Sequence, residues 1–172
     1  MACYYFAAMV SIRQATEADI PAIQQIAVAT WWPTYRPILT EDQIEYMLEL
    51  FYSPKAIASQ MQSGHTYLLL LEDGVPNGFA SFSPRTENKD IYKLHRLYCL
   101  PETKGKGYGR ELLQNVEQLV KKLDRHVLEL NVNIHNPAKG FYERLGYTEA
   151  YAEKIDIGSG YIMDDYVMRK LL

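Results

Sequence analysis

The chain has 172 residues, 48% of them hydrophobic and 23% charged, and its formal net charge is −3. This length and composition predict one ordinary globular domain with its own hydrophobic core. The small negative charge argues against a general attraction to nucleic acid, and we expect neither a nucleic-acid partner nor a membrane partner.

The start of the chain carries no targeting signal that we recognise. Its apolar run is short, and no basic residues precede it, so neither a signal peptide nor a membrane span is expected. The two cysteines, Cys3 and Cys99, provide no disulfide framework, which favours a reducing, cytoplasmic location. We expect residues 1–8 to form a leader and residues 9–172 to form a single domain without a metal site.

The first part of the chain predicts a strand and then a helix. Apolar and polar side chains alternate in residues 10–15, which is typical of a strand. Thr16 and the acidic residues after it are typical of a helix start. We expect this helix to run to about Thr30, because Pro33 and Pro37 interrupt the segment after it.

Two more helices and the main sheet are expected further along the chain. Thr40 and Ser53 are predicted to cap helices that end at Phe51 and Gly64. Later helices are expected at residues 107–124 and 137–145, and a hairpin turn at residues 73–78. The remaining strands are expected at residues 65–72, 79–83, 92–100, 126–133, 148–157 and 161–170.

The segment KGKGYG, Lys104 to Gly109, lies between a predicted strand and a predicted helix. A helix N-terminus has unpaired N–H groups and a partial positive charge, and glycines allow a phosphate to approach them closely. The segment therefore predicts an anion site, although lysines and glycines also occur in solvated turns.

The spacing of this loop decides between several kinds of phosphate site. A P-loop needs Lys followed by Ser or Thr, but here Arg110 and Glu111 come after the last glycine. The dinucleotide fingerprint needs G-x-G-x-x-G, whereas these glycines are spaced G-x-G-x-G. Neither of these two motifs fits the segment.

The pattern K-x-x-G-x-G resembles the pyrophosphate loop of the GNAT superfamily of acyl-CoA-dependent N-acetyltransferases. Lys104 departs from the Gln or Arg of that motif, since it keeps the charge and loses the planar fork of donors. A second segment, LNVNIHNPAKGFYERLGY (130–147), resembles the other signature of the family. The phrasing RLYCLPE and LNVNIHNPA is similar to the branch of PaiA-type spermidine/spermine acetyltransferases.

This resemblance implies an α/β fold of GNAT type, with a mixed central sheet splayed at the cofactor site and flanked by helices. It implies acetyl-CoA as the cofactor and a primary amine, from a small molecule, a polyamine or a peptide, as the acceptor. The implied cofactor-binding residues are Leu97, Tyr98, Cys99, Lys104, Gly105, Lys106, Gly107, Tyr108, Gly109, Arg110, Asn136, Lys139 and Tyr142.

The resemblance also implies roles in catalysis. Tyr142 matches the family's general acid, which would protonate the leaving thiolate. The backbone of residues 97–99 would pair with pantetheine, and one of its N–H groups would polarise the thioester. Asn136 would hydrogen-bond the pantetheine arm, cap the short helix, or do both.

Several residues are candidates for the general base and for attracting the acceptor amine. His95 lies two residues before Leu97, so simple alternation places both on one face of the strand, and a neutral imidazole could take the amine proton. Glu41, Asp42 and Glu45 are candidates for attracting a cationic amine.

Aromatic residues are the candidates for acceptor contact. The resemblance implies such a role for Trp31 and Tyr35, and also for Trp32 and Tyr46. The alternative is that these rings are simply a packed cluster.

Two other functions stay open at this point. The same fold could be an acyl-CoA-binding sensor without turnover. It could also transfer a larger acyl group, given room near Phe141 and the tryptophan pair. Members of the family often pair through their later strands, so a homodimer is possible.

Overall fold

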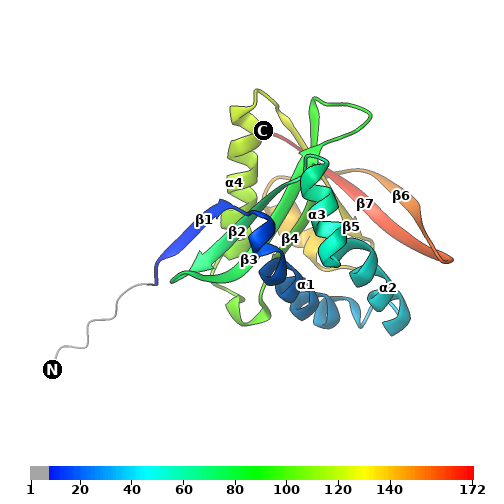
Figure 1. Ribbon diagram of the computed structural model, residues 1–172. Coiled ribbons are helices and arrows are strands. Elements are labelled where there is room, and N and C mark those ends of the chain that lie inside the picture. Colours follow the sequence, from blue (N-terminus) through cyan, green and yellow to red (C-terminus); the bar gives the residue numbers. More distant parts are fainter. Residues whose placement is uncertain (1–7) are drawn as a thin grey trace.

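The computed structural model describes residues 8–172, so Cys3 and nearly all of the expected leader lie outside the described residues. Its centre is a seven-stranded sheet in the order β1-β2-β3-β4-β5-β7-β6 (Figure 1). The strands are β1 (Val10–Gln14), β2 (Thr66–Glu72), β3 (Val75–Pro84), β4 (Ile91–Cys99), β5 (Val127–Asn133), β6 (Thr148–Gly158) and β7 (Tyr161–Leu171).

Helices cover both faces of this sheet. Figure 1 shows α4 on one face and α1, α2 and α3 on the other. The helices are α1 (Ile20–Tyr35), α2 (Glu41–Tyr52), α3 (Pro54–Gln62), α4 (Tyr108–Lys122) and α5 (Ala138–Arg144), with 3-10 turns at Glu17–Asp19 and Pro101–Thr103. The predicted α/β architecture is confirmed.

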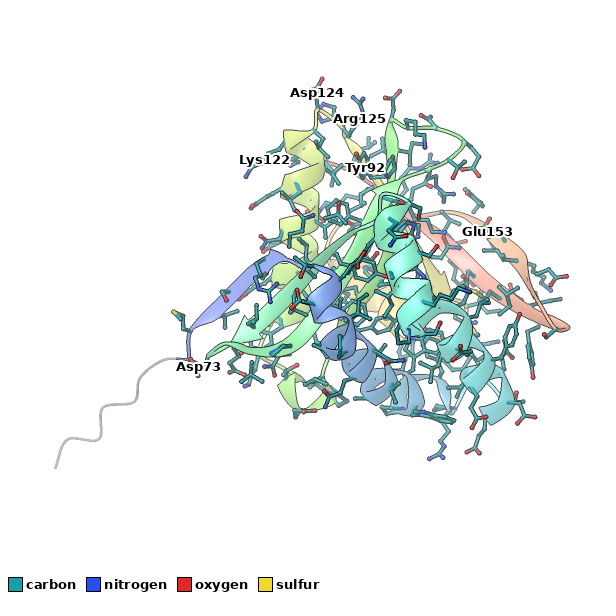
Figure 2. The ribbon with its side chains drawn as sticks, in the orientation of Figure 1. Asp73, Tyr92, Lys122, Asp124, Arg125 and Glu153 are labelled. Carbon is teal, nitrogen blue, oxygen red and sulfur yellow. The ribbon has the colours of Figure 1, made fainter. Side chains whose placement is uncertain are left out.

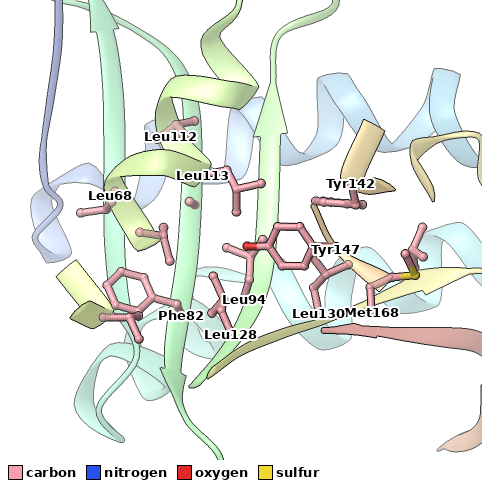
Figure 3. Close-up of a cluster of buried hydrophobic side chains, with 14 of the residues drawn as sticks. Leu68, Phe82, Leu94, Leu112, Leu113, Leu128, Leu130, Tyr142, Tyr147 and Met168 are labelled. Atoms are coloured by element: carbon pink, nitrogen blue, oxygen red, sulfur yellow. The ribbon is translucent and has the colours of Figure 1, made fainter. Parts of the chain in front are cut away.

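Each face of the sheet has its own core, because side chains alternate along the strands. On β2, Leu68 and Leu70 pack with α4, whereas Tyr67 and Leu69 pack with α1 to α3. Figure 3 shows the first of these cores, with Tyr142 and Tyr147 among its members.

The predicted helix caps are confirmed. The side chain of Thr40 accepts a hydrogen bond from Gln43 N at the start of α2, and that of Ser53 accepts one from Ala56 N at the start of α3. Each cap satisfies a backbone donor that the helix itself leaves unpaired.

The predicted end of the first helix is wrong. Helix α1 continues beyond Thr30, through Pro33, and ends at Tyr35. A proline inside a helix removes one backbone hydrogen bond. The extra turn nevertheless buries Trp31, whose ring lies 4.4 Å from that of Tyr35, and this packing favours the helical conformation.

The predicted hairpin turn at residues 73–78 is too long. Glu72 pairs directly with Val75, so the turn consists of Asp73 and Gly74, both with positive φ. Asp-Gly suits such a turn because its backbone twist matches that of the flanking strands. As a result, β3 begins four residues earlier than expected.

Strand β4 contains an irregularity that overturns a third prediction. Ser81 pairs with Arg96 and Phe82 pairs with Leu94, so His95 is an extra residue in β4. A bulge of this kind breaks simple alternation. Leu94 and Leu97 pack on the α4 side, whereas His95 stacks on His65, which lies after α3 in the chain. His95 and Leu97 therefore do not share a face.

Strands β4 and β5 separate along their length. Their parallel pairing covers Ile91 to Leu94 and Val127 to Leu130, and it stops there. Beyond that point β5 stays paired with β7, while β4 stays paired with β3. The second half of β4 thus has a free edge that faces β5.

Among the helices of residues 8–172, none combines the length and the apolar character that crossing a bilayer requires.

Candidate functional site

Three connected cavities run through the molecule at the place where β4 and β5 separate. The loop groove, of about 820 Å³, lies at the glycine loop and the start of α4. The strand-gap cavity, of about 250 Å³, lies between β4 and β5. The aromatic chamber, of about 300 Å³, lies on the side of α1 and α2 and reaches the β6–β7 hairpin.

Shared lining residues connect the three cavities into one passage. The loop groove and the strand-gap cavity share Thr30, Thr34, Leu97, Cys99, Ala138 and Tyr142. The strand-gap cavity and the aromatic chamber share Tyr35, Leu94, His95, Arg96, Tyr98 and Asn131. A long ligand can therefore enter at the loop and reach the chamber.

The loop groove presents backbone donors at the start of α4. Gly105 and Gly107 have φ values of 88° and 83°, a conformation that glycine adopts readily. Glu111 N donates to the Gly107 carbonyl at 3.1 Å, so the N–H groups before it precede the hydrogen-bond ladder of the helix. Such groups form an anion site.

Three cations line the loop groove, and no carboxylate does. They are Lys104 and Arg110, which the sequence predicts, and Arg144, which it does not. Within residues 8–172, none of the three forms an ion pair with a carboxylate. Their charge is available to a phosphorylated ligand.

Two other predicted cofactor-binding residues are engaged in ion pairs. Lys106 Nζ lies 2.7 Å from a carboxylate oxygen of Glu72, and Lys139 Nζ lies 2.8 Å from one of Glu149. Neither lysine lines any of the three cavities. The structure thus brings Arg144 to the groove and holds these two lysines in ion pairs.

The strand-gap cavity exposes the free edge of β4. Leu97, Tyr98 and Cys99 all line it, as the expected pairing with an extended ligand requires. Their register with β3 is regular, from Ala80 opposite Leu97 to Gly78 opposite Cys99. One edge of this stretch is therefore hydrogen-bonded to β3, and the other is open to a ligand.

Tyr142 lies where the strand-gap cavity meets the loop groove. Burial raises the pKa of its phenol, and the neighbouring Cys99 adds to this effect. Burial also raises the pKa of the Cys99 thiol to about 12. Both groups are consequently protonated near neutral pH and can act as proton donors.

Asn136 lines the same cavity and also organises the start of α5. Its Oδ1 accepts a hydrogen bond from Ala138 N at 2.9 Å. The capping role is therefore present, and the side chain still borders the cavity.

The aromatic chamber contains Trp31 and Tyr35 but not Trp32 or Tyr46. Trp31 is also buried in an aromatic cluster, with ring centroids of Tyr52 and Tyr98 at 5.4 and 6.3 Å. The Trp31 ring thus packs in the aromatic cluster and also lines the chamber. Tyr46 instead donates its hydroxyl to the Ile157 carbonyl at 2.6 Å.

His95 borders the chamber, and its surroundings lower the basicity of its imidazole. Its Nε2 lies 2.8 Å from Ser83 Oγ, and its ring stacks on His65 at 4.3 Å. Burial, with smaller contributions from His65 and Arg96, lowers the pKa of His95 to about 2. Its role as general base stays a prediction that this low pKa disfavours.

The charged residues of the chamber differ from those expected. Glu41, Asp42 and Glu45 do not line it. Instead, Lys93 and Arg96 of β4 and the buried Asp165 of β7 do. The sequence gives no local signal for these three residues, because β7 lies far from β4 along the chain.

Comparison with known proteins identifies a family. The family model described as an acetyltransferase (GNAT) domain matches residues 35–163. This range contains the glycine loop, the free edge of β4 and Tyr142.

Individual relatives agree with this match. The spermidine N(1)-acetyltransferase of Thermoplasma acidophilum is 26% identical over 163 residues, which cover 90% of this chain and 96% of that protein. The L-methionine sulfoximine/L-methionine sulfone acetyltransferase of Salmonella typhimurium is 28% identical over 148 residues, 80% of each.

A solved structure shows the same fold. The PaiA N-acetyltransferase of Thermoplasma acidophilum in complex with coenzyme A has a TM-score of 0.80 and 25% identity, covering 95% of this chain and 99% of that one.

Proposed function

The chain belongs to the GNAT family of acetyl-CoA-dependent N-acetyltransferases, and on this premise we propose that it acetylates a primary amine by direct attack in a ternary complex. The observation that carries the proposal is the passage formed where β4 leaves β5, with uncompensated cations at one end and a chamber at the other.

The loop groove holds the diphosphate in this proposal. Of the N–H groups from Gly105 to Arg110, that of Lys106 donates to the Thr103 carbonyl at 3.1 Å and the others donate to the diphosphate, while Lys104, Arg110 and Arg144 supply positive charge. These donors and cations fit an anionic cofactor, since no carboxylate of the groove competes for them.

The free edge of β4 orients the pantetheine arm. Backbone groups of residues 97–99 pair with it, and an N–H of Tyr98 or Cys99 polarises the thioester carbonyl. Acetyl-CoA supplies the acetyl thioester. Asn136 borders the same cavity and is a further contact for the arm.

Tyr142 completes the transfer by protonating the sulfur. As the nitrogen–carbon bond forms and the carbon–sulfur bond breaks, the phenol gives its proton to the leaving thiolate. The phenol is protonated near neutral pH, and its raised pKa makes it a weaker acid, so donation depends on its position against the sulfur. The proton of the attacking amine leaves through water, because the low pKa of His95 makes its imidazole a weak acceptor.

The acceptor is a primary amine that enters through the aromatic chamber, where it meets Trp31 and Tyr35. The names of the relatives span a polyamine and an amino-acid derivative, so family membership supports an amine without ranking these classes. Cytoplasmic location and a homodimer stay predictions of the sequence.

We expect Tyr142→Phe to lower kcat by on the order of 100-fold, because it removes the proton donor and leaves the ring in place. The affinity for acetyl-CoA, measured by calorimetry, should change less than about twofold. Release of CoA thiol in the presence of an amine panel measures the rate.

A matched control is Tyr147→Phe in the same core. The Tyr147 hydroxyl donates to Glu117 at 3.0 Å and lines none of the three cavities, so this variant should keep kcat. Figure 3 shows the two tyrosines close together. An unchanged kcat in Tyr142→Phe would remove Tyr142 from the mechanism.

A further inference from the structure

Arg96 is a cation of the aromatic chamber whose hydrogen-bonding capacity is largely unused. Its guanidinium lies 5.2 Å from the ring centroids of Phe51 and Tyr52, and both rings line the same chamber. NH1 donates to the His95 carbonyl at 3.0 Å. The Nε of Arg96 is buried and has no hydrogen-bond partner.

No carboxylate compensates this charge. Among the side chains of residues 8–172, none of the carboxylates lies within 4.0 Å of Arg96. The contrast is Glu129, a buried carboxylate of β5 that forms ion pairs with both Arg85 and Arg169. Charges withdrawn from water are normally paired, so a half-buried guanidinium that lines a cavity without a carboxylate partner indicates a ligand.

The net charge of the chamber lining is positive, like that of Arg96 itself. Its charged lining consists of Lys93, Arg96 and Asp165, and His95 is neutral near pH 7. Asn131 Nδ2 donates to Glu153 Oε1 at 2.8 Å and lies 3.3 Å from Asp165 Oδ2, so the lining holds one carboxylate and two cations. The chamber therefore has a net positive charge, which attracts an anionic group and disfavours a polycation.

The rest of the lining is mostly apolar. Met47, Ile155, Ile157 and Met163 belong to it, contributed by α2 and the β6–β7 hairpin. Such a wall accommodates a hydrocarbon or thioether side chain.

We propose that the acceptor amine of this enzyme also carries a carboxylate, which Arg96 binds in the aromatic chamber. The planar guanidinium matches a carboxylate with two parallel N–H donors, and the Phe51 and Tyr52 rings hold it in place, each with its centroid 5.2 Å away. This inference rests on the proposed acetyl transfer and names the class of acceptor as an amino acid with an apolar side chain.

The test compares each amino acid with the amine that lacks only its carboxylate. The pairs are L-leucine with 3-methylbutylamine and L-methionine with 3-(methylthio)propylamine, with spermidine as the polycation. Release of CoA from acetyl-CoA gives kcat/KM for each. The wild-type enzyme should prefer the amino acid in each pair by at least about tenfold, and should use spermidine poorly.

Variants of Arg96 then assign this preference to the guanidinium. Arg96→Met should lower kcat/KM for the amino acids by on the order of 30-fold or more, and the preference ratio should fall toward one. Arg96→Lys keeps the charge without the fork and should give an intermediate ratio. Arg125→Gln, at the far end of the molecule (Figure 2), is the matched control and should keep the wild-type ratio.

The outcomes separate the two proposals. If the wild-type enzyme acetylates amines without preferring those that carry a carboxylate, the carboxylate site is overturned and acetyl transfer still stands. The same conclusion follows if Arg96→Lys has a lower Tm but keeps the wild-type preference ratio. Failure of every amine to release CoA, with acetyl-CoA bound, overturns acetyl transfer and this inference together. The wild-type comparison alone decides the matter if Arg96→Met does not fold.

Discussion

Burial changes what single titratable side chains of this protein can do. His95 and Tyr142 both border the strand-gap cavity, and burial shifts the pKa of each toward the neutral form. For Tyr142 this makes the phenol a weaker acid, so its proton transfer depends on close contact with the leaving sulfur. For His95 it removes the basicity that a general base needs.

His95 should also make the stability of the fold depend on pH. Its pKa is 6.5 in the unfolded chain and about 2 in the folded protein, so below pH 6.5 the unfolded chain binds a proton that the folded protein does not. The free energy of unfolding should therefore fall by up to about 1.4 kcal/mol per pH unit below pH 6.5. Above pH 6.5 this contribution is constant.

Urea unfolding of the wild type and of His95→Gln at pH 7 and pH 5 measures this effect. The wild type should lose about 2 kcal/mol more than the variant over this interval. Asp165, whose pKa is also shifted, is present in both proteins, and the double variant His65→Gln/His95→Gln separates the contribution of His65, which stacks on His95. Parallel pH profiles would show that His95 is not buried as described.

At the scale of one element, the glycine loop joins β4 to α4 with a backbone that only glycine adopts easily. Gly107 has a φ of 83° and immediately precedes the first residue of α4. A Cβ added there meets no heavy atom within 4 Å, so the cost of Gly107→Ala is backbone strain alone, about 1 kcal/mol. Relaxation of that strain would turn the N–H groups of the loop.

Gly107→Ala should therefore weaken CoA binding by on the order of tenfold, which corresponds to about 1.4 kcal/mol. Gly74→Ala is the matched control, because Gly74 has a φ of 80° and equal space but lies in the β2–β3 turn. Asp73, labelled in Figure 2, marks that turn. Calorimetry should give the wild-type Kd for Gly74→Ala. Equal Kd values for Gly107→Ala and Gly74→Ala would show that the glycine loop does not contribute to CoA binding.

At the scale of the whole molecule, the passage joins both halves of the sheet. Its walls come from α1, β4 and the start of α4 on one side and from β5 and α5 on the other. A ligand that fills the passage should hold β4 and β5 together at the place where they make no hydrogen bonds to each other.

CoA at 100 times its Kd should stabilise the folded protein by about 2.7 kcal/mol. For a domain of this size, this corresponds to a rise in Tm of about 5–10 °C. Differential scanning calorimetry measures it, and ADP, which reaches only the loop groove, should give a smaller rise at the same concentration. Equal shifts for the two ligands would contradict occupation of the strand gap.

The sequence by itself determined the features that depend on neighbours along the chain. Apolar periodicity, the caps at Thr40 and Ser53, and the order of strand, glycine loop and helix predicted most helices and strands and an anion site, and the resemblance of two segments to GNAT motifs implied the fold class. These features are local, because a cap or a loop needs only a few consecutive residues.

The tertiary structure decided the features that depend on contacts between distant residues. Packing of Trp31 carries α1 through Pro33, and pairing with β3 makes His95 a bulge. The ion pair between Lys106 and Glu72, 34 residues apart, engages a side chain that the sequence predicts to contact the cofactor. Arg96 and Asp165 line one chamber only because β4 and the β6–β7 hairpin both contribute to its wall, and no local pattern encodes a wall built from both.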